Sequence, residues 1–194
     1  MAGPDPLVKL NRIYTRTGDD GTSGLVDGSR VAKHDPLMAA IGDVDEANST
    51  LGVAIRSVED GGLRDLLLRI QNELFDLGAD LATPWDGMAG EHDLRVTERQ
   101  VTALEAAIDR ANESLDPLKS FILPGGSAAA AALHVARATI RRAERGVVAA
   151  AAERTINPAV PMYLNRLSDL AFVLARSVNK DAGGDVLWVP GASR

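Results

Sequence analysis

Apolar side chains recur at intervals of three and four residues along most of this 194-residue chain. That spacing places them on one face of an α-helix, so it predicts amphipathic helices that pack together. The helices are expected at residues 35–58, 63–81, 97–115, 127–153 and 162–178. Capping signals support three of the starts: Asp35 precedes a proline, Ser127 follows two glycines, and residues 97–100 form a capping-box sequence. Five such helices and little else predict an all-α five-helix bundle.

A glycine- and threonine-rich segment precedes the first helix, with glycines at positions 18, 21 and 24. One interpretation is a short hairpin that pairs residues 13–17 with 22–26 and turns at Asp20 and Gly21. The other is a nest of backbone N–H groups and hydroxyls that suits phosphate oxygens. The two are compatible, and the cations Arg30 and Lys33 follow directly. Neither the Walker A pattern nor GxGxxG is present, so a nucleotide site here would belong to neither common class.

The whole chain, residues 1–194, is expected to form a single domain. It divides into a flexible N-terminal segment (1–34), the helical bundle (35–178) and a C-terminal tail (179–194). The apolar run at 186–189 in the tail predicts an extended closing strand. Phe121 lies just ahead of the fourth helix; the simplest interpretation makes it a plug in the core, and its position also makes it a candidate site residue.

The fourth helix carries four arginines between positions 137 and 145. At about 100° per residue, Arg137, Arg141, Glu144 and Arg145 share one face beside an apolar stripe, whereas Arg142 points elsewhere. Such a face is either solvated, with ion pairs between Glu144 and the neighbouring arginines, or a receptor for a polyanion. Guanidinium groups match phosphate oxygens in geometry and stay charged, which is why the second interpretation remains.

Two further polar groups bear on that choice. Residues 42–49 form an acidic and polar cluster on the first helix, which is either an exposed patch or the source of a carboxylate that orients an arginine of the fourth helix. Asn165 and Asp169 lie one turn apart on the last helix, and if they are buried the arginine face is the obvious source of partners. Arg166 and Arg176 are expected on the surface.

Composition excludes several classes of function. The net charge of −6 argues against nucleic acid as a partner. The absence of cysteine removes disulfides, thiolate metal sites and cysteine nucleophiles. None of the three histidines follows a glutamate at the spacing of di-iron bundles, and a hydrolase nucleophile elbow is missing. No apolar stretch is long enough for a membrane span and no signal core is evident, so a cytoplasmic protein without a membrane partner is expected.

Six blocks of sequence together resemble the ATP:cob(I)alamin adenosyltransferases of the propanediol-utilisation (PduO) type. The blocks are residues 14–22, 30–33, 42–46, 121–126, 137–145 and 163–169. They occur in the family's order and spacing over nearly the whole chain, which makes the combination specific although each block alone is weak.

The resemblance implies a five-helix bundle that assembles as a homotrimer with active sites between subunits. It implies that the 5′-deoxyadenosyl group of ATP is transferred to the cobalt of cob(I)alamin, giving adenosylcobalamin and triphosphate, with Mg²⁺ as cofactor. Displacement at a ribose carbon needs no protein nucleophile, but it needs cations and N–H donors for the leaving group. A flavin-type reductase and a B12-dependent acceptor enzyme are the implied partners. The alternatives are an ATP-sensing regulatory bundle without catalysis and a structural helical oligomer.

The family motifs also imply roles for single residues. Triphosphate binding falls to Thr15, Arg16, Thr17, Gly18, Ser23 and Lys33. Nucleotide binding from the helices falls to Arg141, Arg142, Ala143, Glu144, Arg145 and Asn165. Glu144 would orient a cation or a water on Mg²⁺, and Asp45 would pair with Arg137 across the subunit boundary. Phe121 would displace the lower base of the corrin, with Asp169 supporting the same pocket. The implied catalytic set is Asp45, Phe121, Arg137, Arg141 and Glu144.

Overall fold

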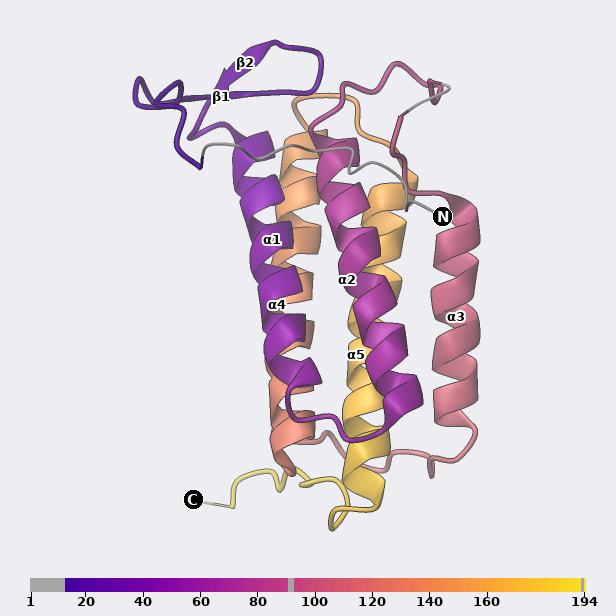
Figure 1. Cartoon of the computed structure of the whole chain (residues 1–194). Coiled ribbons are helices and arrows are strands. Elements are labelled where there is room, and N and C mark those ends of the chain that lie inside the picture. The colour runs from indigo at the N-terminus through magenta and orange to yellow at the C-terminus, as the bar shows by residue number, and fades with distance from the viewer. Residues whose placement is uncertain (1–12, 91–92, 193) are drawn as a thin grey trace.

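The computed structural model describes residues 13–90, 93–192 and 194. Within them lie five α-helices and one two-stranded sheet (Figure 1). In chain order these are β1 (Thr22–Gly24), β2 (Arg30–Ala32), α1 (Pro36–Ile55), α2 (Gly61–Leu81), α3 (Glu98–Asn112), α4 (Ala128–Ala151) and α5 (Ala159–Lys180). The expected all-α five-helix bundle is confirmed. None of the described helices is long and apolar enough to cross a membrane.

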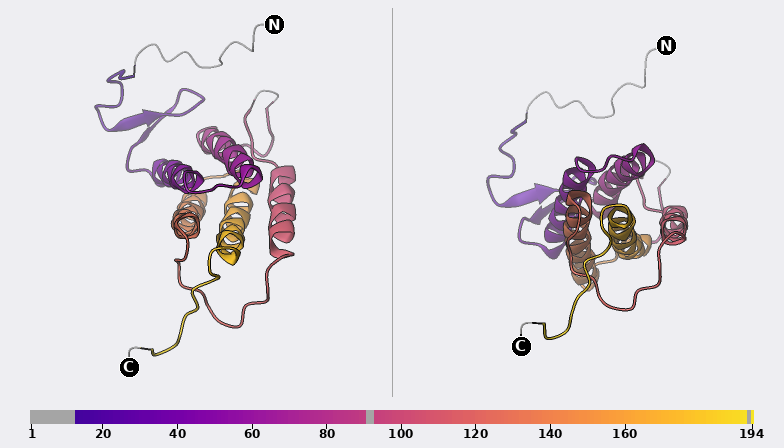
Figure 2. Two further views of the ribbon diagram at one scale, coloured as in Figure 1. Left: turned by 60° about the horizontal axis from the view of Figure 1, so that its bottom comes forward. Right: turned by 90° about the horizontal axis from the view of Figure 1, so that it is seen from below.

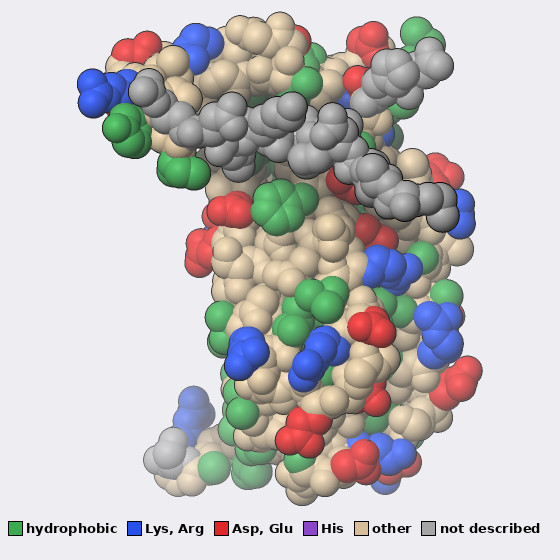
Figure 3. Space-filling model, in the orientation of Figure 1, with side chains coloured by type: hydrophobic (Ala, Val, Ile, Leu, Met, Phe, Trp, Pro, Cys, Tyr) green, Lys and Arg blue, Asp and Glu red, His purple; other side chains and the backbone are tan. Residues whose placement is uncertain are grey.

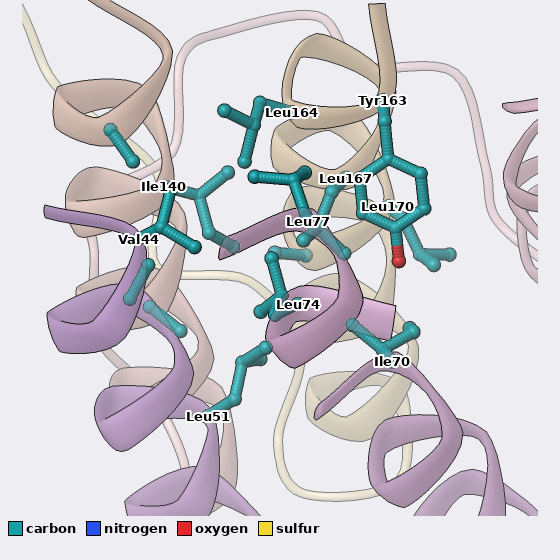
Figure 4. Packing of buried hydrophobic residues seen from close by; sticks show 14 of the residues in the cluster. Val44, Leu51, Ile70, Leu74, Leu77, Ile140, Tyr163, Leu164, Leu167 and Leu170 are labelled. Carbon is teal, nitrogen blue, oxygen red and sulfur yellow. The ribbon is translucent and has the colours of Figure 1, made fainter. Parts of the chain in front are cut away.

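The helices pack so that α4 and α5 form the centre of the bundle. α1 lies along α4, α2 lies against α1, and α3 packs against α5 at the outer edge (Figures 1 and 2). Large apolar side chains from α1, α2, α4 and α5 meet in the interior of the bundle and are almost completely buried (Figure 4). They include Leu51, Leu74, Leu77, Ile140 and Leu167. The interior is built from these apolar stripes, as their spacing predicted.

Local capping chemistry sets the helix ends close to the predicted positions. The Asp35 carboxylate accepts a hydrogen bond from the Leu37 amide at 2.8 Å, and the Ser127 hydroxyl accepts one from the Ala130 amide at 3.2 Å. The predicted capping box at residues 97–100 is present. The last helix begins three residues earlier than predicted, because the Asn157 side chain accepts from the Ala159 amide at 3.0 Å. Pro161 is tolerated because it lies in the first turn.

The predicted hairpin is wrong in its register. β1 pairs with β2, with Thr22 opposite Ala32 and Gly24 opposite Arg30, so the connecting turn lies at residues 25–29 rather than at Asp20. Asp-Gly occurs at both places, and the second one forms the turn, with Gly28 at φ 83°. The Val26 amide donates to the Ala82 carbonyl at 3.0 Å, which ties this hairpin to the end of α2.

The C-terminal tail folds back under the bundle, at the end opposite the hairpin (Figure 1). It pairs with the segment before α4 through an Ile122–Leu187 bridge, so the predicted closing strand is confirmed as an extended pairing. The tail also covers Arg176, whose Nε donates to Asp185 at 2.9 Å and whose Nη2 donates to the Asp116 carbonyl at 2.8 Å. Arg176 is therefore buried, and its expected place on the surface is wrong.

Candidate active site

The arginine face of α4 is the centre of the candidate site. Arg141 and Arg145 are exposed, whereas Arg137 and Glu144 are half-buried beside α5. Arg145 Nη1 donates to the Arg141 carbonyl at 2.9 Å. Among the residues that the structure describes, Arg137, Arg141 and Arg145 form no ion pair with a carboxylate. The ion-paired interpretation of this face is not what the single chain shows, and the exposed guanidiniums of Arg141 and Arg145 remain available to an anion.

Glu144 is held by α5 instead of by its arginine neighbours. Its Oε1 accepts from Asn165 Nδ2 at 2.9 Å, and the side-chain oxygen Oδ1 of Asn165 accepts from Arg166 Nη1. Arg166 also donates to Glu105 of α3 at 3.0 Å and lies 3.7 Å from Asp169. Asn165 thus fixes one carboxylate at the edge of the arginine face. The partner of Asn165 could not be identified from the sequence, because it depends on the register between α4 and α5.

Arg142 points away from this face, as the helical spacing predicted. Its Nε donates to Asp43 Oδ1 at 2.9 Å, and its Nη2 pairs with Glu46. The acidic cluster of α1 therefore does orient an arginine of α4. This arginine is Arg142, which lies outside the shared face. Within the single chain its guanidinium is occupied by carboxylates, so the contact between Arg142 and ATP that the resemblance implies stays a prediction.

Arg137 and Asp45 do not meet within the chain. Arg137 Nε is buried without a hydrogen-bond partner in the described structure, whereas Asp45 is exposed and lines a groove between α1 and α2 that includes Phe75. His134, one turn before Arg137, is buried against Phe172 with a ring-centroid separation of 6.3 Å. Burial, and then the charge of Arg137, lower the pKa of His134. Among the described residues neither group has an ion-pair partner, so a contact between Arg137 and Asp45 would have to join two subunits.

The N-terminal segment presents hydroxyls and cations beyond the N-terminal end of α1. The Thr15 and Thr17 hydroxyls are 2.9 Å apart, and the Arg16 guanidinium lies 5.5 Å from the ring centroid of Tyr14. Arg16 has a positive φ of 64°, a conformation that non-glycine residues rarely adopt and that recurs at functional sites. Ser23 lies in β1, and Lys33 directly follows β2 and is exposed. Basic side chains are visible at this hairpin end in Figure 3.

Phe121 is not in the core: 78% of it is exposed. Its ring meets that of Trp188 edge-on, with centroids 6.0 Å apart, and the two line a shallow pocket with Leu118 and Pro190. Further exposed apolar residues surround them, and we call the whole set the tail patch. The tail patch consists of Leu118, Phe121, Leu123, Val186, Leu187, Trp188 and Val189. The apolar run at 186–189 was the one sequence signal for the tail patch, but no local pattern indicated that this run lies beside Phe121.

The described residues contain no group of three or more His, Asp or Glu side chains that could hold a metal ion by themselves. Glu144 is the single carboxylate on the arginine face. One carboxylate together with substrate phosphates is a common way to bind Mg²⁺, which keeps much of its water shell. The residues present therefore fit a magnesium ion that arrives with a nucleotide.

Comparisons with known proteins agree with this arrangement. The family model for cobalamin adenosyltransferase matches residues 13–178. A corrinoid adenosyltransferase of Mycobacterium tuberculosis is 50% identical over 190 residues, which cover 96% of this chain and 97% of that protein. The corrinoid adenosyltransferase PduO of Salmonella typhimurium is 44% identical over 88% of this chain and 50% of its own length.

Solved structures give the same result. A variant of the PduO-type ATP:corrinoid adenosyltransferase from Lactobacillus reuteri, complexed with cobalamin and ATP, superimposes with a TM-score of 0.85. It is 39% identical and covers 92% of this chain and 97% of its own. Another variant of that enzyme, complexed with ATP, gives a TM-score of 0.83 at 39% identity, over 91% of this chain and 100% of its own. The chain belongs to the cobalamin adenosyltransferase family, as its six sequence blocks predicted.

Proposed function

We propose that this protein transfers the 5′-deoxyadenosyl group of ATP to cob(I)alamin. In this reaction the electron pair on cobalt forms the bond to C5′, the C5′–O bond breaks, and triphosphate leaves with the bonding electrons. The observation that carries the proposal is the face of α4 on which Arg137, Arg141 and Arg145 lack carboxylate partners in the described chain. Pre-placed cations are what a highly charged leaving group requires, because they need no rearrangement when the bond breaks.

The nucleotide contacts follow from this face. Arg141 and Arg145 would bind the triphosphate as fixed charges, while the hydroxyls of Thr15 and Thr17 and the ammonium of Lys33 would enclose it from the N-terminal segment. Glu144 would hold Mg²⁺ directly or through water, in the orientation that Asn165 gives it. When bound, the ion would neutralise part of the charge of the triphosphate.

The tail patch would contact the corrin. It is a group of adjacent exposed apolar side chains, of the kind that marks a binding surface. Phe121 is its most exposed aromatic residue, so an apolar ring is available to cover one face of a flat macrocycle and to exclude the lower base. Asp169 is exposed and held near Arg166, and its role in the same pocket stays a prediction.

The assembly and setting are also part of the proposal. A homotrimer would bring Asp45 of one subunit to Arg137 of the next and complete the site between them. We place this single-domain enzyme in the cytoplasm, where ATP is abundant. A reductase, expected to be of the flavin type, must supply Co(I), and a B12-dependent enzyme must accept the product.

One experiment separates catalysis from ATP sensing. The protein is mixed anaerobically with ATP, Mg²⁺ and chemically reduced cob(I)alamin, and both the visible spectrum of the corrin and released triphosphate are followed. We expect stoichiometric adenosylcobalamin and triphosphate. An ATP-sensing bundle would bind ATP without forming either product, and a structural oligomer would show no ATP-induced rise in melting temperature.

The variant Phe121→Ala tests the corrin assignment in the same assay. Because Phe121 is exposed, the melting temperature should be unchanged and the Kd for ATP should stay within about twofold of wild type, whereas the rate of alkylation should fall by about tenfold or more. Equal losses in ATP affinity and rate would contradict a specific role in corrin binding.

A further inference from the structure

The hairpin carries two cations whose surroundings differ. Arg30 Nε donates to the Thr22 hydroxyl at 2.8 Å, and Arg30 Nη2 donates to the Thr17 carbonyl at 2.6 Å. Its Nη2 also lies 3.8 Å from Asp20 Oδ1. Lys33 makes no hydrogen bond through its side chain and no ion pair with any residue that the structure describes. Two cations three residues apart are therefore used in different ways.

Arg30 is the centre of a closed set of contacts around the turn at residues 17–22. Asp20 Oδ1 accepts from the Thr22 amide at 2.9 Å and from the Thr22 hydroxyl at 2.7 Å. These two hydrogen bonds hold the pKa of Asp20 below its usual range, so its carboxylate stays ionised near Arg30. The Thr22 hydroxyl donates to Asp20 and accepts from Arg30. The guanidinium thus joins β2 to both ends of the turn.

Gly18 has an ordinary φ, so the backbone conformation alone does not require glycine there. The space around it is tight, because a Cβ at position 18 would lie 3.1 Å from the Thr22 carbonyl, 3.2 Å from Lys33 Nζ and 3.3 Å from Lys33 Cε, so the lysine side chain would have to move aside. The lysine chain lies directly over the glycine. Gly24, which also has an ordinary φ, has only Arg30 Nη1 nearby, at an unstrained 3.9 Å.

We propose that Arg30 is a positioning residue that shapes the turn at residues 17–22, and that Gly18 leaves the space in which Lys33 reaches the phosphates. This inference rests on the proposed function, since it assigns the parts of its triphosphate site. Arg30 acts through the Thr17 carbonyl and the Thr22 hydroxyl and does not touch the nucleotide. The ammonium group of Lys33 contacts the phosphates instead.

The first test replaces Arg30 by lysine and by alanine. A lysine keeps the charge but cannot donate to Thr17 and Thr22 at the same time with a planar fork. Both variants should raise the KM for ATP and the Ki of inorganic tripolyphosphate by about tenfold, with kcat within about threefold of wild type. For Arg30→Lys, which keeps the charge, the dependence of KM on salt should stay that of wild type. A lysine variant with wild-type KM, or an alanine variant without effect, would overturn the role of Arg30.

The second test is a double-mutant cycle between Gly18→Ala and Lys33→Ala, with Gly24→Ala as the matched control. Gly18→Ala should weaken binding of ATP and of tripolyphosphate by about tenfold in the wild-type background and by clearly less when Lys33 is already alanine, where only the contact with the Thr22 carbonyl remains. Gly24→Ala should change neither. Equal costs of Gly18→Ala in both backgrounds would show that Gly18 does not act through Lys33. Formation of adenosylcobalamin by the unaltered protein reports on the proposed function independently of both tests.

Discussion

At the scale of single residues, Arg141 and Arg142 are neighbours in sequence with opposite surroundings. Arg142 is engaged by Asp43 and Glu46, whereas Arg141 is exposed and has no carboxylate partner among the described residues. The helical period alone predicted this separation, because consecutive residues lie about 100° apart. The identity of the partners was not predictable, since it depends on how α1 and α5 are aligned with α4.

This contrast gives a prediction for two alanine variants. Arg141→Ala should lower kcat by about 10² to 10³, the usual cost of removing one preorganised group that stabilises developing charge, with unchanged helix content by circular dichroism. Arg142→Ala should chiefly lower the melting temperature, because it releases two carboxylates of α1. Arg110→Ala, on the exposed side of α3, is the control and should change neither quantity. Normal turnover by the Arg141 variant would remove the arginine face from the leaving-group role.

At the scale of elements, the turn before α4 connects Phe121 to the bundle. The Asn179 side chain of α5 accepts from the Ser127 amide at 2.9 Å and donates to the Gly125 carbonyl at 3.1 Å. Gly126 between them has φ 101°, and a Cβ there would lie 2.3–2.6 Å from the Asn179 side chain. One asparagine thus occupies the space that a side chain at position 126 would need.

Two glycines in this turn should therefore respond differently to alanine. Gly126→Ala should destabilise the protein by at least about 1 kcal/mol, from the positive φ alone, and by more if Asn179 is displaced. Gly125→Ala should be tolerated, since nothing lies within 4 Å of its Cβ position. Urea unfolding of both variants measures the difference. Similar midpoints for the two would contradict the role of Asn179.

The contact between α4 and α5 also contains a group that responds to pH. Burial lowers the pKa of His134 below its ordinary value of 6.5, with Arg137 adding to the effect and Asp185 opposing it. Below pH 6.5 the His134 side chain binds a proton in the unfolded chain more readily than in the native protein. The free energy of unfolding should therefore fall as the pH drops from 7.5 to 5.5. His134→Leu should reduce this dependence, and His34→Gln, at an exposed position, should leave it unchanged. Urea midpoints at the two pH values test this sign.

How far the sequence predicted the elements depended on the range of the interactions involved. Helices could be located because their period and caps, such as Asp35 and Ser127, lie within a few residues of one another. The hairpin could not, because Asp-Gly occurs twice within the N-terminal segment and the choice depends on the docking of Val26 onto α2. Arg176 was misplaced on the surface for the same reason: its partner Asp185 comes from a tail whose path no local pattern specifies.

At the scale of the whole molecule, the site residues are spread along the bundle. The hairpin lies at one end, the tail patch at the other, and the arginine face of α4 between them (Figure 1). Asp45 lines the groove between α1 and α2, whereas Arg137 lies on α4 outside that groove. A heterologous contact that closes into a ring would join these two faces at every boundary.

Mixing of two inactive variants tests this assembly. An Asp45→Ala subunit keeps Arg137, and an Arg137→Ala subunit keeps Asp45, so each variant alone should have little activity. In a closed trimer that contains both kinds, one of the three boundaries unites the two retained groups. Random assembly gives about three quarters mixed trimers, so co-refolding equal amounts should restore about a quarter of wild-type activity.

The control pairs Asp45→Ala with the double variant Asp45→Ala/Arg137→Ala. No boundary in that mixture contains an aspartate at position 45, so activity should not return, although the subunits exchange in the same way. If Asp45 and Arg137 acted within one chain, the first mixture would stay as inactive as its components, because every chain in it lacks one partner. Recovery in the first mixture and not in the second therefore requires that the pair spans two subunits, and it locates the complete site at the boundary rather than in the single bundle.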